Sequence, residues 1–308
     1  MVDSKQQWKA WLYLLPAIIL LLVFTVYPIF NTIRVAFLEN YNALTATKQA
    51  TFKFGLGNFH YVLFEYDDFL QCLKITAILC VVTVPISTLL ALLIAVCLNS
   101  IKPLNRLLQT IFFLPYVTNS IAIGMVFTAM FNIVGTVRGI TSPGIVNIFL
   151  GLFGVSPIDW INNNSTELAN IIVMVIYIVW NALPFKILIL LGGLQSVNKQ
   201  YYDAAKVDGT SRVRVFWRIT VPLLSPMLAY VIITGFIGGF KEYSSIVGVF
   251  GDDMGPDGRL NTMVGFIYTN IKEKQEYGVA SAAALILFLI IFAVTLVNLY
   301  VSKKKVHY

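Results

Sequence analysis

Charged residues are scarce in this chain, and their scarcity excludes an ordinary soluble domain. They make up 12% of the 308 residues, whereas hydrophobic residues make up 58% and the mean hydropathy is +0.78. Soluble domains carry about a quarter charged residues. Because a helix that spans a bilayer needs about 20 mostly apolar residues, the composition predicts one membrane domain over residues 1–308.

Cysteine and histidine are also rare, which argues against a disulfide framework or a metal centre. The three cysteines, Cys72, Cys80 and Cys97, fall in or beside a single apolar run, where cysteine is a small packing residue. The two histidines, His60 and His307, lie far apart in the sequence. We therefore predict no metal site.

Motifs for nucleotide chemistry and for hydrolysis are missing as well. Gly135 and Gly139 are not followed by the Lys-Ser/Thr pair of a phosphate-binding loop. Neither a Gly-x-Ser-x-Gly elbow nor a His-Glu-x-x-His motif is present. We expect no catalytic residue, no cofactor and no enzyme activity in this chain, so ATP and magnesium would be bound by another subunit.

What the chain has instead is six apolar runs, each long enough to cross a bilayer. They are roughly Trp11–Phe30, Cys72–Leu98, Ile111–Val134, Leu168–Leu190, Met227–Val249 and Val279–Val301. The fifth run contains Gly235, Gly238 and Gly239, which predicts that it is bent or closely packed. The first run is longer than a signal-peptide core and lacks a small-x-small cleavage site, so we interpret it as a retained helix. The predicted fold class is an all-α membrane protein with six transmembrane helices.

Basic residues mark alternate loops of this predicted topology. They gather at the two ends of the chain and in the even-numbered loops: Lys5, Lys9, Lys102, Arg106, Lys199, Lys206, Arg212, Arg214, Arg218 and Lys303–Lys305. Because cytoplasmic loops are rich in Lys and Arg, both termini are predicted to be cytoplasmic. The net charge of +7 therefore reports topology in a lipid bilayer. A nucleic-acid partner is the weaker explanation, because the basic residues are scattered beside the membrane.

The polar segment 195–226 between the fourth and fifth runs has the pattern of a helical elbow. Ser196 or Asn198 can cap the start of a helix by accepting backbone N–H bonds. The helix can run over Lys199–Asp208 and stop at Gly209, since glycine readily takes the left-handed conformation at a helix end.

A second helix is predicted directly after this stop. Thr210 or Ser211 can cap it, it can run over Arg212–Thr220, and Pro222 would end it. Asp208 lies at the negative end of the first helix, where a carboxylate is mildly unfavourable. Pairing of Asp208 with an arginine of the second helix or with another chain, and simple capping of the turn, both stay open.

This loop resembles a known signature. The sequence Asp203-Ala204-Ala205-x-x-Asp208-Gly209, followed by Phe216, Ile219, Pro222 and Pro226, is similar to the Glu-Ala-Ala-x-x-x-Gly signature of ATP-binding cassette importer permeases. The resemblance implies a type I importer-permease fold, with a cytoplasmic coupling helix that docks on a separate ATPase subunit. The coupling residues that it implies are Asp203, Ala204, Ala205, Lys206, Asp208 and Gly209. Asp203 stands where the family has Glu, and Val221 where it has Leu; both changes leave the elbow intact.

Shorter matches along the chain resemble the carbohydrate-uptake branch of this family, and within it the first permease of the maltose or glycerol-phosphate type. They are Tyr27-Pro28-Ile29, Gly57-Asn58-Phe59, Leu114-Pro115, Trp180, Pro184-Phe185, Gly193-Leu194-Gln195, Ile267-Tyr268 and Gly278-Val279-Ala280-Ser281-Ala282. The resemblance implies a di- or oligosaccharide substrate, a second homologous permease in a heterodimer, two ATPase subunits, an extracellular solute-binding protein and a bacterial cell membrane. The segment 251–256 departs from the family pattern, so phosphate esters, polyamines and amino acids stay open as solutes.

A sugar path needs aromatic faces for the rings and polar groups for the hydroxyls. The candidates are Asn119, Phe127, Tyr177, Trp180, Asn181, Phe240, Glu242 and Tyr243. Asn181 and Glu242 are favoured, because polar groups inside a span are costly and usually functional. Packing against core or lipid stays open for the aromatic residues, as does an interhelical hydrogen bond for Asn119 and Asn181.

Lys186 is an isolated cation inside the fourth run. We expect its side chain to snorkel to the membrane interface. Pairing with an acidic group of a partner subunit, or with an anionic solute, is the alternative.

Two rival classes of function are a membrane enzyme and an ion-driven transporter. A membrane enzyme would need carboxylates or histidines clustered in the spans. An ion-driven transporter is expected to have repeated halves and broken helices around buried charges. The sequence reveals neither pattern, and it favours the importer permease.

Overall fold

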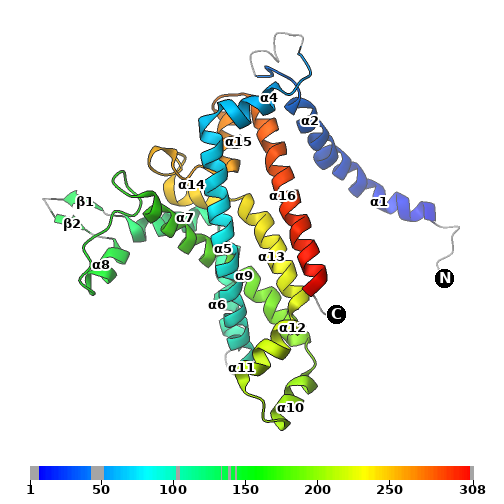
Figure 1. Ribbon diagram of the computed structural model, residues 1–308, viewed down its shortest axis with the longest axis vertical. Helices are drawn as coiled ribbons and strands as arrows, with labels where there is room; N and C mark the ends of the chain where they lie inside the picture. The colour runs from blue at the N-terminus through cyan, green and yellow to red at the C-terminus, as the bar shows by residue number, and fades with distance from the viewer. Residues whose placement is uncertain are drawn as a thin grey trace. The chain divides into compact units, whose positions relative to one another are not determined.

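The computed structural model describes residues 7–42, 52–101, 105–132, 134–137, 140–142 and 144–305. These residues are almost all helical (Figure 1). They form two compact units: unit 1 lies within Met1–Phe69 and Phe266–Phe288, and unit 2 within Leu70–Gly265 and Leu289–Tyr308. Three helices contribute residues to both units: α5 (Asp67–Ser100), α15 (Met263–Lys272) and α16 (Tyr277–Lys305). The single domain over residues 1–308 stays a prediction.

The apolar runs form helices of membrane-spanning length. Four stretches qualify individually: Trp8–Ala36, Asp67–Ser100, Glu167–Ser196 and Tyr277–Lys303. Two bent helix pairs qualify when each is counted as one span: Leu107–Val117 with Ser120–Phe131, bent by 97°, and Arg212–Leu223 with Ser225–Phe240, bent by 68°. By length and composition, the described residues therefore offer up to six spans, in agreement with the six predicted runs.

The third and fifth runs are not single straight helices, however. The third breaks after Val117 and ends at Phe131, so Val134 lies in a strand and not in the span. The predicted close packing at the glycines of the fifth run is confirmed, since a Cβ atom at Gly239 would lie 2.8 Å from Cys80 Sγ and one at Gly235 3.1 Å from Val84 Cγ1. The fifth run follows a bend at Leu224, between two prolines, because proline removes a backbone donor and crowds the preceding turn. Its helix ends at Phe240, so the predicted extension to Val249 is wrong. Broken helices, which the sequence did not reveal, are a feature of this chain.

In unit 1 the buried side-chain amide of Asn58 links α4 (Gly57–His60) to the end of α2 (Tyr27–Ala36). The helical elements of this unit before α5 are α1 (Gln7–Leu21), a π-helical turn (Leu22–Val26), α2, α4 and a second π-helical turn (Tyr61–Glu65). Asn58 Nδ2 donates to the carbonyl oxygens of Ala36 at 3.0 Å and Leu38 at 2.8 Å. A Cβ atom at Gly278 would lie 2.8 Å from this same nitrogen, so glycine is required at the start of α16.

Unit 2 holds most of the remaining elements. They are α6 (Asn105–Val117), α7 (Ser120–Phe131), β1 (Val134–Val137), β2 (Ile140–Ser142), α8 (Ile145–Gly151), α9 (Glu167–Ser196), α10 (Lys199–Val207), α11 (Arg212–Val215), a π-helical turn (Phe216–Thr220), α12 (Val221–Leu223), α13 (Ser225–Phe240), α14 (Ser244–Phe250) and a 3-10 turn (Pro256–Gly258). Strands β1 and β2 pair antiparallel, with Val137 opposite Ile140. The rest of unit 2 is built around the long helix α9.

Helix α7 packs directly on α14, and the two lie side by side in Figure 1. A Cβ atom on Gly124 of α7 would overlap the backbone of Gly248 on α14, so two glycines allow the helix backbones to touch. Thr128 Oγ1 donates to the Val249 carbonyl at 2.6 Å and links the same two helices. Small residues at a crossing are the usual way in which helices approach closely in membranes. This contact holds the bent half of the third run in place.

Candidate functional site

The coupling loop, residues 195–226, begins with a firmly capped helix. Asn198, and not Ser196, caps α10: its Oδ1 accepts the Gln200 N–H at 3.0 Å. Ser196 instead closes the end of α9 by donating to the Gly193 carbonyl at 2.8 Å. Figure 1 shows α10 at the end of unit 2 that lies away from α14.

The end of α10 is a Schellman turn. Gly209 has φ +63°, the Gly209 N–H donates to the Lys206 carbonyl at 3.1 Å, and the Thr210 N–H donates to the Ala205 carbonyl at 2.9 Å. A Cβ atom at Gly209 would meet nothing, so its backbone conformation and not space selects glycine. The predicted stop is confirmed, although the helix ends at Val207 and Asp208 is its C-cap.

The second arm of the elbow runs further than predicted. Ser211 caps α11 by accepting the Arg214 N–H at 3.4 Å. The helix then continues through the π-helical turn and α12, so Pro222 does not end it. Pro222 lies in the first turn of α12, where its missing N–H costs little, and the bend follows at Leu224.

The predicted coupling residues face outward with one exception. Asp203, Ala204, Lys206, Asp208 and Gly209 are exposed, whereas Ala205 is buried. Asp203 and Lys206 form an ion pair at 3.5 Å on the exposed surface. Among the described residues Asp208 forms no ion pair, so it caps the turn without help from an arginine of the second arm. Of the two alanines of the signature, only Ala204 is therefore accessible to another subunit.

A polar pocket lies between α5, α9 and α13 of unit 2, with a volume of about 290 Å³. It is lined by Thr83, Val84, Ser87, Tyr116, Ile178, Asn181, Ala182, Phe185, Lys186, Thr234, Gly235, Gly238, Gly239 and Glu242. Two predicted path residues, Asn181 and Glu242, lie here. Glu242 Oε1 accepts the Ser245 N–H at 3.3 Å, which anchors the carboxylate at the start of α14.

Lys186 does not snorkel, so that expectation is wrong. Its side chain is 5% exposed, and its Nζ donates to Ser87 Oγ at 2.7 Å and to Thr88 Oγ1 at 3.0 Å. A third, longer bond of 3.3 Å reaches the Val84 carbonyl. The ammonium lies in the interior, where α5 offers it three oxygen acceptors.

An aromatic pocket lies on another face of α9, with a volume of about 850 Å³. It is lined by Leu114, Pro115, Thr118, Ile123, Val126, Phe127, Met130, Phe131, Val146, Leu150, Trp160, Ile176 and Trp180. The predicted path residues Phe127 and Trp180 meet here, with ring centroids 5.6 Å apart. Tyr177, which is fully buried and does not line the pocket, packs on Phe127 with ring centroids 4.8 Å apart.

The other predicted path residues line neither pocket. Asn119 caps α7, with its Oδ1 accepting the Ile121 N–H at 2.8 Å, so its hydrogen bond is local and not interhelical. The Tyr177 hydroxyl donates to the Ser120 carbonyl at 2.5 Å. Phe240 is buried at the end of α13, and Tyr243 packs against the core around Tyr177. The eight candidates therefore do not gather in one pocket.

Sequence reasoning missed Ser87 and Gly235, which line the polar pocket, and Thr88, which accepts a hydrogen bond from Lys186. Both hydroxyls also donate to carbonyls of their own helix, Ser87 to Thr83 at 2.6 Å and Thr88 to Val84 at 2.7 Å. Such residues are common in membrane helices and give little signal. The pairing of these two hydroxyl residues with a buried lysine about 100 residues away can be recognised only once the fold is known.

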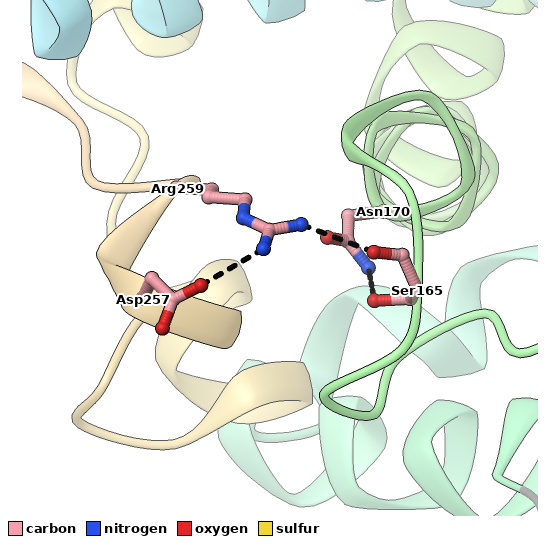
Figure 2. A network of polar contacts seen from close by, with 4 residues as sticks. All are labelled: Ser165, Asn170, Asp257 and Arg259. Atoms are coloured by element: carbon pink, nitrogen blue, oxygen red, sulfur yellow. Dashed lines mark hydrogen bonds and ion pairs between the residues drawn. The ribbon is translucent and has the colours of Figure 1, made fainter.

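A second polar network connects Ser165, Asn170, Asp257 and Arg259 (Figure 2). Arg259 donates to the Ser165 carbonyl at 3.1 Å and pairs with Asp257 at 2.8 Å. Asn170 Nδ2 donates to Ser165 Oγ at 2.8 Å and to the Trp160 carbonyl at 2.7 Å. Arg259 thereby links the loop after α14 to the start of α9.

Three comparisons bear on what this arrangement is. A sequence model of the family described as binding-protein-dependent transport system inner membrane component matches residues 87–307. The chain is 29% identical over 305 residues to the arabinooligosaccharides transport system permease protein AraP of Bacillus subtilis (strain 168), covering 95% of this chain and 88% of that protein. It is also 29% identical over 293 residues to the trehalose/maltose transport system permease protein MalF of Thermococcus litoralis, covering 95% and 93%.

The fold has a solved counterpart. A chain of a bacterial alginate ABC transporter, crystallised in complex with an alginate pentasaccharide-bound periplasmic protein, superposes with a TM-score of 0.79. The alignment covers 98% of this chain and 96% of that chain, at 22% identity. At this identity the likeness bears on the fold alone, and it agrees with the predicted importer-permease fold.

Proposed function

Because this chain belongs to the family of binding-protein-dependent transport system inner membrane components, we propose that it is the permease subunit of an ATP-driven importer of di- or oligosaccharides. The family match carries the proposal, because residues 87–307 include the coupling loop and most of the polar pocket. Similar proteins named for arabinooligosaccharides and for trehalose or maltose support the sugar class. Another solute, such as a phosphate ester or a polyamine, is the alternative.

The coupling loop is the contact through which another subunit supplies energy. Helix α10 is exposed except at Ala205, which is buried, and Tyr202, which is half-buried, and a cap and a Schellman turn fix its two ends. A short helix fixed in this way moves as a rigid body when a docked partner moves. We assign that role to Asp203, Ala204, Lys206, Asp208 and Gly209, with Ala205 packing the helix onto its own chain.

The proposed assembly contains this chain, a second homologous permease, two ATP-binding cassette ATPases that bind ATP and magnesium, and an extracellular solute-binding protein. It lies in a bacterial cell membrane with both termini of this chain in the cytoplasm. The description of the family, which names dependence on a binding protein, supports the solute-binding protein as a partner. The alginate transporter crystallised with its periplasmic protein is a further parallel.

The polar pocket is the segment of the solute path that this chain supplies. It combines Asn181, Thr234 and Glu242, which can bind sugar hydroxyls, with the rings of Tyr116 and Phe185, stacked 5.7 Å apart. Ligand sites are typically mostly apolar with a few convergent polar groups. The polar pocket has that composition.

Co-purification from the native membrane tests the proposal. The tagged chain should bring down a second six-span permease and an ATPase, identified by mass spectrometry. Ala204→Glu places a charge on the exposed coupling surface and should lose the ATPase while keeping the second permease. The matched control is Asp252→Lys, an exposed change in the predicted external loop, which should keep both. Recovery of the chain alone, or retention of the ATPase by Ala204→Glu, would contradict the proposal.

A further inference from the structure

The polar pocket contains a buried cation that has no acidic partner within the described part of the chain. Lys186 is 5% exposed, and the ion pairs of the described residues involve other cations, namely His60, Lys74, Lys206 and Arg259. A buried ammonium without a counter-ion is costly and is usually retained for a function. Among the described residues the ammonium of Lys186 is therefore held only by neutral oxygen acceptors, while the carboxylate of Glu242 lines another part of the same pocket.

The three acceptors of Lys186 hold it unequally. Ser87 Oγ and Thr88 Oγ1 accept at 2.7 and 3.0 Å, whereas the Val84 carbonyl accepts at 3.3 Å. That carbonyl already accepts the Thr88 hydroxyl at 2.7 Å and the Ser87 hydroxyl at 3.2 Å. The third N–H of the ammonium is thus weakly bound to the Val84 carbonyl, and an oxygen of a bound molecule can replace that carbonyl as its acceptor.

A glycine keeps the approach to the ammonium open. A Cβ atom at Gly235 on α13 would lie 3.3 Å from Lys186 Nζ and 3.1 Å from Val84 Cγ1. Gly235 lines the polar pocket together with Lys186. Any larger residue at this position would stand between the pocket and the charge.

The pocket also has a second, chemically different end. Glu242 lies beyond the end of α13, seven residues after Gly235. Five of these residues are helical, so at about 1.5 Å per residue the backbones of Gly235 and Phe240 lie roughly 7.5 Å apart along α13. A carboxylate accepts hydrogen bonds from sugar hydroxyls, whereas an ammonium prefers an anionic oxygen.

We propose that Lys186 forms an anion subsite of the polar pocket, so that the importer takes sugars bearing an acidic group in preference to neutral sugars. The acidic group is a uronate carboxylate or a phosphate ester, bound at Lys186 while hydroxyls of the same sugar meet Asn181 and Glu242. This inference rests on the proposed function, since it names the substrate class of the same path.

Uptake of matched sugar pairs by the complete importer tests the inference. The importer is reconstituted in proteoliposomes with its solute-binding protein and supplied with ATP. One pair is digalacturonate and galactobiose, and the other is trehalose 6-phosphate and trehalose. Uptake of at least one acidic member should be about 10-fold or more faster than that of its neutral partner, the ratio expected for one charge-assisted hydrogen bond. Which pair shows the preference distinguishes the carboxylate from the phosphate.

The outcomes separate the two proposals. Uptake of the neutral members alone, equal uptake of both members, or uptake of none of the four overturns the anion subsite. If the ATPase and the second permease still co-purify, the importer function stands. If no ATPase co-purifies, both proposals are overturned.

Two variants then assign the preference to Lys186. Lys186→Gln should raise the KM for the preferred acidic sugar about 10-fold to 100-fold with little change in kcat, and Lys186→Arg should restore most of the affinity. Gly235→Ala keeps the lysine and should raise the same KM, whereas Gly192→Ala, where a Cβ meets nothing within 4 Å, should not. A wild-type KM in both Lys186→Gln and Gly235→Ala would overturn the inference.

Discussion

The polar pocket and the aromatic pocket are lined by different faces of the same helix, α9, yet they differ in almost every chemical respect. Lys186, Asn181 and Glu242 line the first, whereas the second is lined by apolar and aromatic side chains apart from Thr118. Trp180 and Asn181 are consecutive residues, but about 100° of helical rotation separates neighbours. Two path residues predicted from residue type alone therefore lie on different faces of α9.

The difference teaches which surface can select a solute. Selection of a hydroxylated molecule needs hydrogen-bonding groups, because an unmatched polar group costs more than an unmatched apolar contact. The polar pocket supplies such groups from four helices, α5, α6, α9 and α13, and from Glu242, whereas the aromatic pocket supplies few. We therefore expect changes in the polar pocket to alter transport, and changes around the aromatic pocket to alter stability.

The largest expected effect is on the acceptors of Lys186. Ser87→Ala combined with Thr88→Val removes two hydrogen bonds to a buried ammonium, and should cost about 3 kcal/mol or more. Adding Lys186→Met to this double variant should recover most of the loss, because both sides of the contact are then apolar. The midpoint of thermal unfolding of the purified permease in detergent measures both. A double variant as stable as the original chain, or a further loss in the triple variant, would show that these bonds are not what stabilises the pocket.

The next effect concerns the helix crossing that borders the aromatic pocket. Gly124→Ala would drive a methyl group into the backbone of Gly248 and should cost about 1–3 kcal/mol by overpacking. Gly192→Ala is the control, since a Cβ there meets nothing within 4 Å and alanine favours the helix. The same unfolding assay should separate the two variants. Equal stabilities would mean that α7 and α14 can move apart freely.

A matched pair of neighbours compares the two pockets directly. Asn181→Leu should reduce sugar uptake about 10-fold, the effect of losing one or two hydrogen bonds, whereas Trp180→Leu should change it by less than about 3-fold. Uptake of the labelled sugar in proteoliposomes, normalised to the amount of importer, gives the ratio. If Trp180→Leu proved the more damaging of the two, the assignment of the solute to the polar pocket would fail.

The smallest effect is expected at Tyr177, behind the aromatic pocket. Tyr177→Phe removes the hydrogen bond to the Ser120 carbonyl but keeps the ring packed on Phe127. It should lower stability by about 1 kcal/mol and leave the KM for the sugar unchanged. Measurement of both quantities on one preparation tests it; a raised KM would place Tyr177 in the solute path.

Much of the fold followed from local signals. The number of apolar runs and the stop at Gly209 were predicted correctly, although the third and fifth runs end earlier than predicted. Asn198 and Ser211 were among the alternatives named for the two helix caps. Each depends on residues close in sequence, such as Asn198 Oδ1 and the Gln200 N–H.

The pockets did not follow, because they depend on contacts between distant residues, and the bend at Leu224 was missed although its two prolines are close in sequence. Lys186 finds its partners on α5, about 100 residues away, so snorkelling was the reasonable but wrong expectation. Pro222 and Pro226 lie in the first turns of α12 and α13, and the bend falls at Leu224 between these two helices. Asn119 was read as a path residue because its role as a helix cap appears only once the third run is seen to break.

The most direct test of this account is a structure of the complete importer with its sugar bound in the membrane. The account predicts solute density in the polar pocket, between Lys186 and Glu242 and within hydrogen-bond distance of Asn181. Density stacked against Phe127 and Trp180, with the polar pocket free of solute, would contradict it.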